Sequence, residues 1–160
     1  MSLLGMVAGL VEAEIDFVVI GGLAARAHGS ARITEDLDIC YEPGATNVER
    51  LASLLREWHA YLRGVEGLPF IMDERTFRDT PIMTLVTDRG ALDVMDRVPG
   101  VGNYARVLEA SVAISAGSTA FRALDLPALL AAKRATGRPK DLAQIPELEA
   151  LLELRGRRGR

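Results

Sequence analysis

Three acidic residues in short apolar contexts define the chemistry that this sequence could perform. Asp36 and Asp38 lie two residues apart in "DLDIC", and Asp93 lies in "GALDVM" between Leu92 and Val94. Residues two apart on a strand point to the same face, so Asp36 and Asp38 would place two negative charges side by side. A carboxylate that faces a core is costly unless a positive charge lies against it. The pair is therefore either a solvated strand edge or a cation site.

A divalent cation is the partner that these carboxylates favour. Mg²⁺ prefers carboxylate oxygens and keeps several waters, which leaves positions for phosphate. Three acids that face inward on adjacent strands can hold two metal ions roughly 3.5 to 4 Å apart, an arrangement suited to in-line phosphoryl chemistry. We therefore take Asp36, Asp38 and Asp93 as candidate catalytic residues and as candidate ligands of two Mg²⁺ or Mn²⁺ ions.

A double glycine precedes the acidic pair. Gly21 and Gly22 follow the β-branched run "DFVVI", which predicts a buried strand, and they precede the short helix expected in "LAARAH". Without a Cβ, the glycine backbone can approach a phosphate closely. A tight turn from strand to helix without a ligand would favour the same residues. We take Gly21 and Gly22 as candidate nucleotide-binding residues.

Hydrophobic periodicity and turn residues predict an α+β order of elements. Besides the strand and helix around the double glycine, the expected elements are a first helix from residue 3, a strand over 36–40, a helix from a Thr46–Glu49 capping box to Leu62, a loop with a short strand over 68–80, a hairpin over 81–96, a helix over 103–110, a hairpin about Gly117, a helix capped by Asp125, and helical pieces from Pro139 and Pro146 to the end.

Length and composition limit the class of protein. A chain of 160 residues is expected to form a single domain, 1–160, and its 49% hydrophobic content argues against disorder. No apolar run approaches the ~20 residues of a membrane span, and the start of the chain lacks the basic region of a signal peptide. The single cysteine, Cys40, agrees with a reducing compartment. We therefore expect a cytoplasmic protein that does not engage a membrane.

The charges are unevenly distributed along the chain. Residues 1–100 carry 16 acidic and 9 basic side chains, whereas residues 101–160 carry 6 acidic and 10 basic ones. Only 2 of the 19 basic residues are lysines, Lys133 and Lys140, both in the basic part. A compact ammonium suits a phosphate as a point charge, although surface helices also commonly carry lysine. The pattern is compatible with an acidic cation site facing a basic anion site, and uneven surface charge without any ligand would give the same counts.

Together these parts resemble the DNA polymerase β-like nucleotidyltransferase superfamily. Its motif is a hydrophobic residue, Gly, Gly or Ser, a spacer, and Asp-hydrophobic-Asp. Here Ile20, Gly21 and Gly22 precede thirteen residues and then the triplet Asp36 to Asp38. The resemblance implies an α+β core, a mixed sheet flanked by helices with a small helical C-terminal part. It also implies transfer of a nucleoside monophosphate from a nucleoside triphosphate to a hydroxyl, with two Mg²⁺ or Mn²⁺ ions as cofactors.

A narrower resemblance is to the abortive-infection nucleotidyltransferases that act as type IV toxins. In these, Arg-x-Thr/Ser precedes the acidic motif, and a helical Lys and a Lys-Asp pair follow later; Arg32, Thr34, Lys133 and Lys140-Asp141 occupy those places. By this resemblance Arg32, Thr34, Lys133 and Lys140 bind the nucleotide, and Asp141 orients Lys140. The acceptor would be RNA, such as tRNA, or a protein hydroxyl, and an antitoxin would be the partner.

Two other functions are compatible with the same residues. A small-molecule nucleotidyltransferase of the antibiotic-modifying kind would use the same acids and metals, and a non-catalytic nucleotide-binding module could retain the fold. The three acids argue against the module. Ser30 is expected to be solvated in its loop, His28 to be a helix-end residue rather than a base, and the tail from Arg155 to Arg160 to be frayed.

Overall fold

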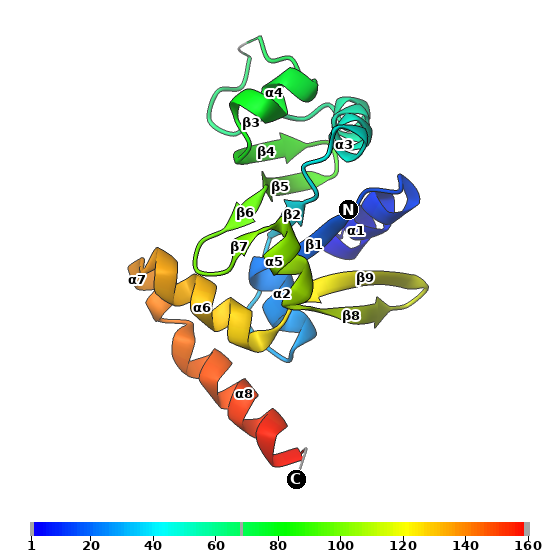
Figure 1. Ribbon diagram of the computed structural model, residues 1–160. Coiled ribbons are helices and arrows are strands. Elements are labelled where there is room, and N and C mark those ends of the chain that lie inside the picture. Colours follow the sequence, from blue (N-terminus) through cyan, green and yellow to red (C-terminus); the bar gives the residue numbers. More distant parts are fainter. Residues whose placement is uncertain (1, 68, 159–160) are drawn as a thin grey trace.

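A seven-stranded mixed sheet organises the computed structural model, which describes residues 2–67 and 69–158 (Figure 1). The strands run in the order β3-β4-β5-β2-β1-β9-β8. Their bounds are β1 (Phe17–Ile20), β2 (Asp36–Tyr41), β3 (Tyr61–Leu62), β4 (Met83–Thr87), β5 (Gly90–Met95), β8 (Ser111–Ala116) and β9 (Thr119–Leu124). The β2–β5 and β1–β9 pairs are parallel, and the other neighbours are antiparallel. A separate short ladder joins β6 (Arg97–Val98) to β7 (Gly102–Asn103).

Helices flank this sheet and close the C-terminal part of the chain. They are α1 (Leu3–Glu12), α2 (Gly21–Ala27), α3 (Ala45–Glu57), α4 (Glu74–Asp79), α5 (Tyr104–Glu109), α6 (Leu126–Thr136), α7 (Pro139–Leu142) and α8 (Ile145–Arg158). In Figure 1, α6, α7 and α8 gather at the end of the molecule opposite α3 and α4. The architecture confirms the predicted fold class, α+β with a mixed sheet flanked by helices and a helical C-terminal part.

The elements with the clearest sequence patterns form as predicted. All four residues of β1 are buried, and the strand lies inside the sheet, between β2 and β9. The β4–β5 turn, the β8–β9 hairpin and α6 also form, and the Asp125 carboxylate accepts a hydrogen bond from the Ala128 N–H at 2.9 Å as a helix cap. The start of α2 differs, because the helix includes the two glycines instead of following them.

The predicted helix from a Thr46–Glu49 capping box to Leu62 is wrong at both ends. Gly44 occupies the N-cap of α3 without a side-chain bond, so Thr46 and Glu49 both lie inside the helix. At the other end the helix stops at Glu57, where His59 adopts a φ of 53°. The residues that follow, Tyr61–Leu62, pair with β4 as an edge strand, which a helical pattern read along the sequence alone does not reveal.

The segment expected to be a loop with a short strand contains a helix instead. The Asp73 carboxylate accepts from the Thr76 N–H at 2.9 Å and caps α4, which buries Phe77 against Tyr41 with the ring planes 79° apart. The sequence does contain a signal for this helix, because Asp73 is a favourable N-cap residue and helix-compatible residues follow it. Leu68, at the start of the expected segment, lies outside the described residues.

The C-terminal segment is helical through Arg158 instead of frayed from Arg155, and Arg155 ties it to the rest of the fold. The Arg155 guanidinium donates to His28 Nδ1 at 2.7 Å, while His28 Nε2–H donates to the Leu124 carbonyl at 2.8 Å. Burial, together with the nearby Arg155, lowers the pKa of His28 despite the Leu124 bond. His28 caps the end of α2, as expected, and there joins α2 to β9 and α8. The last two positions of the expected tail, 159–160, lie outside the described residues.

None of the described helices combines the length and apolar character needed to cross a membrane.

Close packing between α1 and Trp58 generates a stability prediction. A Cβ added at Gly9 would lie 2.7 Å from Trp58 Cζ2, whereas a Cβ at Gly156 would meet nothing within 4 Å. Overpacking a core costs about 1–3 kcal/mol, which exceeds the roughly 1 kcal/mol by which helices favour Ala over Gly. We expect Gly9→Ala to lower the free energy of unfolding by about 1 kcal/mol and Gly156→Ala to leave it equal or higher. Urea unfolding followed by circular dichroism checks both; a Gly9→Ala protein as stable as the parent would contradict the packing.

Candidate functional site

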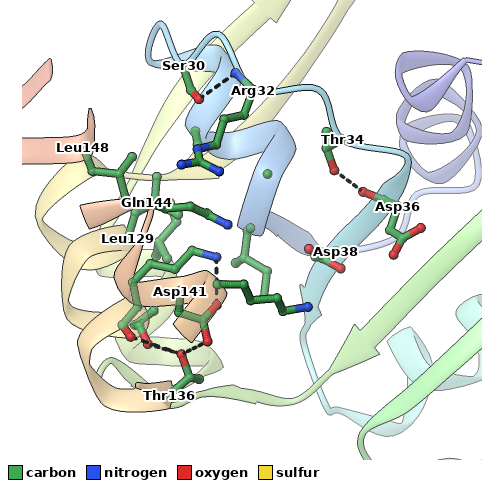
Figure 2. A pocket seen from close by; sticks show the side chains of 18 of the residues that line it. Ser30, Arg32, Thr34, Asp36, Asp38, Leu129, Thr136, Asp141, Gln144 and Leu148 are labelled. Carbon is green, nitrogen blue, oxygen red and sulfur yellow. Dashed lines mark hydrogen bonds and ion pairs between the residues drawn. The ribbon is translucent and has the colours of Figure 1, made fainter. Parts of the chain in front are cut away.

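The three acidic residues of the sequence motif share one face of the sheet. In the parallel β2–β5 ladder Asp38 lies opposite Asp93, and Asp36 lies opposite Ala91. Leu37, between the two β2 acids, is fully buried on the other face. Since paired residues of a ladder project to the same side, the register brings together all three candidate metal ligands. Figure 2 shows Asp36 and Asp38 on β2 at the edge of a cavity.

The arrangement changes the pKa of Asp38. Burial, then the charge of Asp93 and a hydrogen bond with its carboxyl group, raise the pKa of Asp38 from 3.8 to about 7. Asp36 adds to the shift, and Lys133 opposes it. The charged form of Asp38 is therefore disfavoured without a counter-charge, and a cation beside it would be strongly favoured.

The double glycine lies directly against the acidic strand. Gly21 has a φ of 65°, and a Cβ there would lie 2.1 Å from Asp38 Oδ2. At Gly22 a Cβ would lie 2.7 Å from both Cβ and Oγ1 of Thr34. Both positions therefore exclude a side chain because of close approach, which the sequence alone could not distinguish from a simple turn requirement.

The loop between α2 and β2 is fixed by the C-terminal helices. Arg32 donates to the Ala143 carbonyl at 3.1 Å and lies 3.9 Å from Glu147, while the Thr34 hydroxyl donates to the Asp36 carbonyl at 3.2 Å. Ser30, expected to be solvated, is buried and donates to Glu147 at 2.6 Å. The expectation for Ser30 failed because its partner lies 117 residues away in the sequence.

A buried carboxylate organises the basic residues across the cavity. Asp141 is 1% exposed and accepts from Arg138 Nε at 2.7 Å and the Thr136 hydroxyl at 2.8 Å, with Lys133 Nζ at 3.4 Å. Burial alone would raise the pKa of Asp141, but these donors lower it below its usual range. Asp141 therefore orients Lys133. The expectation that it orients Lys140 is not met, because Asp141 is buried whereas the adjacent Lys140 is exposed.

All the predicted site residues line one cavity of about 570 Å³, and Figure 2 shows Arg32, Thr34, Asp36 and Asp38 among its lining. They are Gly21, Gly22, Arg32, Thr34, Asp36, Asp38, Asp93, Lys133 and Lys140. The acids come from the sheet and the lysines from α6 and α7, so the cavity separates opposite charges. Its volume falls in the range of small-ligand pockets.

Sequence reasoning missed several polar residues that line the same cavity. Arg138 and Thr136 donate hydrogen bonds to Asp141. Glu147 accepts a hydrogen bond from Ser30 and lies near Arg32. The half-buried Gln144 also lines the cavity, and Figure 2 shows its side chain reaching into it. No spacing pattern marks these residues, because the α6–α8 region is placed against the loop only by tertiary packing.

The acids have the donor chemistry of a Mg²⁺ or Mn²⁺ site, since hard divalent ions take carboxylate oxygens. Within residues 2–67 and 69–158, however, no group of three or more His, Cys, Asp or Glu side chains is arranged to hold a metal ion. Two of the acids are turned to Arg63 instead, whose Nη2 donates to Asp93 Oδ1 at 3.0 Å and whose Nη1 lies 3.8 Å from Asp36 Oδ2. The carboxylates are therefore of the right chemical type for these ions, and Arg63 contacts two of the three.

Comparisons with known proteins agree with this fold. No protein-family model matches the chain, and no curated protein matches its sequence. A crystal structure from Thermotoga maritima, described as that of "a putative nucleotidyltransferase", is similar with a TM-score of 0.50. The match covers 97% of this chain and 91% of that chain at 13% sequence identity. At this identity the similarity shows a shared fold, which confirms the fold expected from the sequence.

The shifted titration of Asp38 predicts how stability depends on pH without metal. Because the folded protein binds this proton up to about pH 7 and the unfolded chain only to about 3.8, the stabilising contribution of the protonated group is lost as pH rises through 7. The slope is at most about 1.4 kcal/mol per pH unit. We expect Asp38→Asn to reduce this slope and to be more stable than the parent at pH 8.

Thermal melts in EDTA between pH 4 and pH 8 provide the measurement. Asp79→Asn, which changes an exposed acid of α4, is the control and should keep the slope of the parent. Equal slopes for the parent and Asp38→Asn would show that Asp38 does not titrate in this range.

Proposed function

We propose that this protein is a divalent-metal-dependent nucleotidyltransferase that moves a nucleoside monophosphate from a nucleoside triphosphate to a hydroxyl. One observation carries the proposal: the β2–β5 register places Asp38 beside Asp93 on the wall of a cavity whose other wall bears Lys133 and Lys140. Neither wall alone implies this chemistry. Carboxylates suit divalent ions, ammonium groups suit phosphates, and a metal-bound triphosphate needs both.

We propose a role for each candidate residue. Asp36 and Asp38 would be shared ligands of two metal ions, and Asp93 would complete the catalytic one. Gly21 and Gly22 line the cavity beside Asp38, and their backbone would contact the phosphates. A second set lies across the cavity and in its loop, and would neutralise or position the triphosphate: Arg32, Thr34, Lys133 and Lys140.

In the proposed reaction the acceptor oxygen attacks the α-phosphorus and the bond to the bridging oxygen breaks. Pyrophosphate leaves with that electron pair, and the hydroxyl proton passes to a base at the Asp93 carboxylate or to water. Bound Mg²⁺ or Mn²⁺ would supply charge neutralisation and orient the attacking and leaving oxygens. Lys133 and Lys140 would stabilise the charge that develops on the departing pyrophosphate.

For the acceptor we propose RNA, such as tRNA, or a protein hydroxyl, in a toxin-like role with a cognate antitoxin as partner. The support is the Arg32-x-Thr34-x-Asp36 sequence with the later Lys133 and Lys140-Asp141, which the structure brings into one cavity. A small-molecule, antibiotic-modifying activity is the alternative for the same site. In either case residues 1–160 would act as one nucleotidyltransferase domain.

A labelling experiment tests the activity and separates the acceptors. The protein is incubated with each α-labelled nucleoside triphosphate, Mg²⁺, and total RNA, candidate proteins or aminoglycosides. We expect label in one macromolecular fraction and a loss of at least about a hundredfold in Asp38→Asn, because removing one metal-binding charge removes transition-state stabilisation.

The same assay contains a matched control. Asp96 is three residues from Asp93 but pairs with Arg97 and lies outside the cavity lining, so Asp96→Asn should keep its activity. Asp93→Ala should still bind the triphosphate and lose turnover. Transfer by Asp38→Asn at the parental rate would refute the proposed site, and label only on aminoglycosides would favour the antibiotic-modifying alternative.

Lys133 offers a test of the phosphate-binding wall. A charge-assisted contact to phosphate contributes roughly 1.5–3 kcal/mol, so Lys133→Ala should weaken triphosphate binding by about ten- to a hundredfold. Lys133→Arg should also weaken it, since a planar fork does not replace an ammonium beside Asp141. Arg134→Ala is the control, because that neighbour pairs with Glu149 on an exposed surface.

Calorimetry with Mg²⁺ and the triphosphate measures these affinities. Thermal melts check that Lys133→Ala stays folded, as expected because Asp141 keeps Arg138 and Thr136 as partners. If Lys133→Ala binds as the parent does, the lysine lies outside the triphosphate site.

A further inference from the structure

We propose that Arg63 is the resident counter-cation of the metal-free site and competes with the divalent ion for Asp36 and Asp93. This inference rests on the proposed function, because it takes those carboxylates as metal ligands. Arg63 lies directly after β3, on the β4 side of β5, and it is absent from the lining of the triphosphate cavity. Neither the sequence motif nor the cavity points to it.

The contacts of Arg63 reach two acids at once. Nη2 donates to Asp93 Oδ1 at 3.0 Å, and Nη1 lies 3.8 Å from Asp36 Oδ2. These acids belong to neighbouring strands, so one guanidinium spans the β2–β5 ladder where its carboxylates repel each other. A planar guanidinium that never loses its charge is suited to such a position.

The backbone of Arg63 fixes where this cation can act. Its N–H donates to the Thr84 carbonyl at 3.0 Å, and Thr84 is the antiparallel partner of Asp93. A further bond from Nη2 to the Leu85 carbonyl, at 3.3 Å, holds the side chain across β4. The base of the side chain is therefore anchored beside Asp93 whether or not the guanidinium stays in contact with the acids.

A divalent ion and this guanidinium cannot share the same oxygens. Both are cations, and both use lone pairs of Asp93 and Asp36, so binding of one opposes binding of the other. The Arg63 side chain is 37% exposed, so the guanidinium can leave for solvent when a metal ion replaces its charge at Asp93. Metal alone would then bind weakly, and the negative charge of a triphosphate across the cavity would favour exchange of the guanidinium for the ion.

Titration of Mn²⁺ into the nucleotide-free protein tests the competition. We expect Arg63→Gln to bind Mn²⁺ more tightly than the parent by roughly two- to fivefold, because a partly exposed ion pair contributes up to about that factor. Arg97→Gln is the matched control: Arg97 also pairs with an aspartate, Asp96, but that acid is not a proposed ligand. It should bind Mn²⁺ as the parent does.

Thermal melts separate competition from a structural role. In EDTA, Arg63→Gln should melt below the parent because Asp36 and Asp93 lose their counter-charge, and saturating Mn²⁺ should raise its melting temperature by more than it raises that of the parent. A residue with only a structural role would lower the melting temperature equally in both conditions.

The outcomes distinguish this inference from the proposed function. Equal or weaker Mn²⁺ binding by Arg63→Gln overturns the competition, and if the parent still transfers nucleotide the proposed function stands. If neither protein binds Mn²⁺ without nucleotide but the parent still transfers nucleotide, the competition is likewise overturned and the proposed function stands. If neither protein binds Mn²⁺ and transfer is also absent, both proposals fail.

Discussion

The repulsion between Asp38 and Asp93 across the parallel β2–β5 ladder is the constraint around which this structure is arranged. Burial disfavours the charged form of Asp38, and the register fixes the Asp93 carboxyl group beside it; together they raise the pKa of Asp38 to about 7. Neighbouring residues accommodate these two carboxylates. Gly21 yields the space that a Cβ would take from Asp38, and Arg63 supplies a positive charge to Asp93.

A second carboxylate, Asp141, lies between two positive charges on the far wall of the cavity. Lys133 and Arg138 would repel each other, and the almost fully buried Asp141 holds both. Breaking such a buried pair is costly, so Asp141 fixes Lys133 at the cavity rather than leaving it mobile in solvent. Acids from the acid-rich first part of the sequence and lysines from its basic last part thereby line the same cavity.

Features that depend on local periodicity could be predicted from the sequence, and features that depend on distant contacts could not. The strand at Asp36–Tyr41 and the helix capped by Asp125 follow from alternation and capping chemistry close in sequence. The place of Tyr61–Leu62 is set by pairing with β4, so helical spacing there was misleading. Arg63 had no motif to mark it, because its importance comes from acids about thirty residues away on both sides.

The most direct measurement is a crystal structure with Mn²⁺ and a non-hydrolysable nucleoside triphosphate, with Mn²⁺ located by anomalous scattering. Our account predicts anomalous peaks at the carboxylates of Asp38 and Asp93, with the triphosphate between Gly21 and Lys133. Manganese bound away from these carboxylates, or a triphosphate bound outside this cavity, would contradict the account.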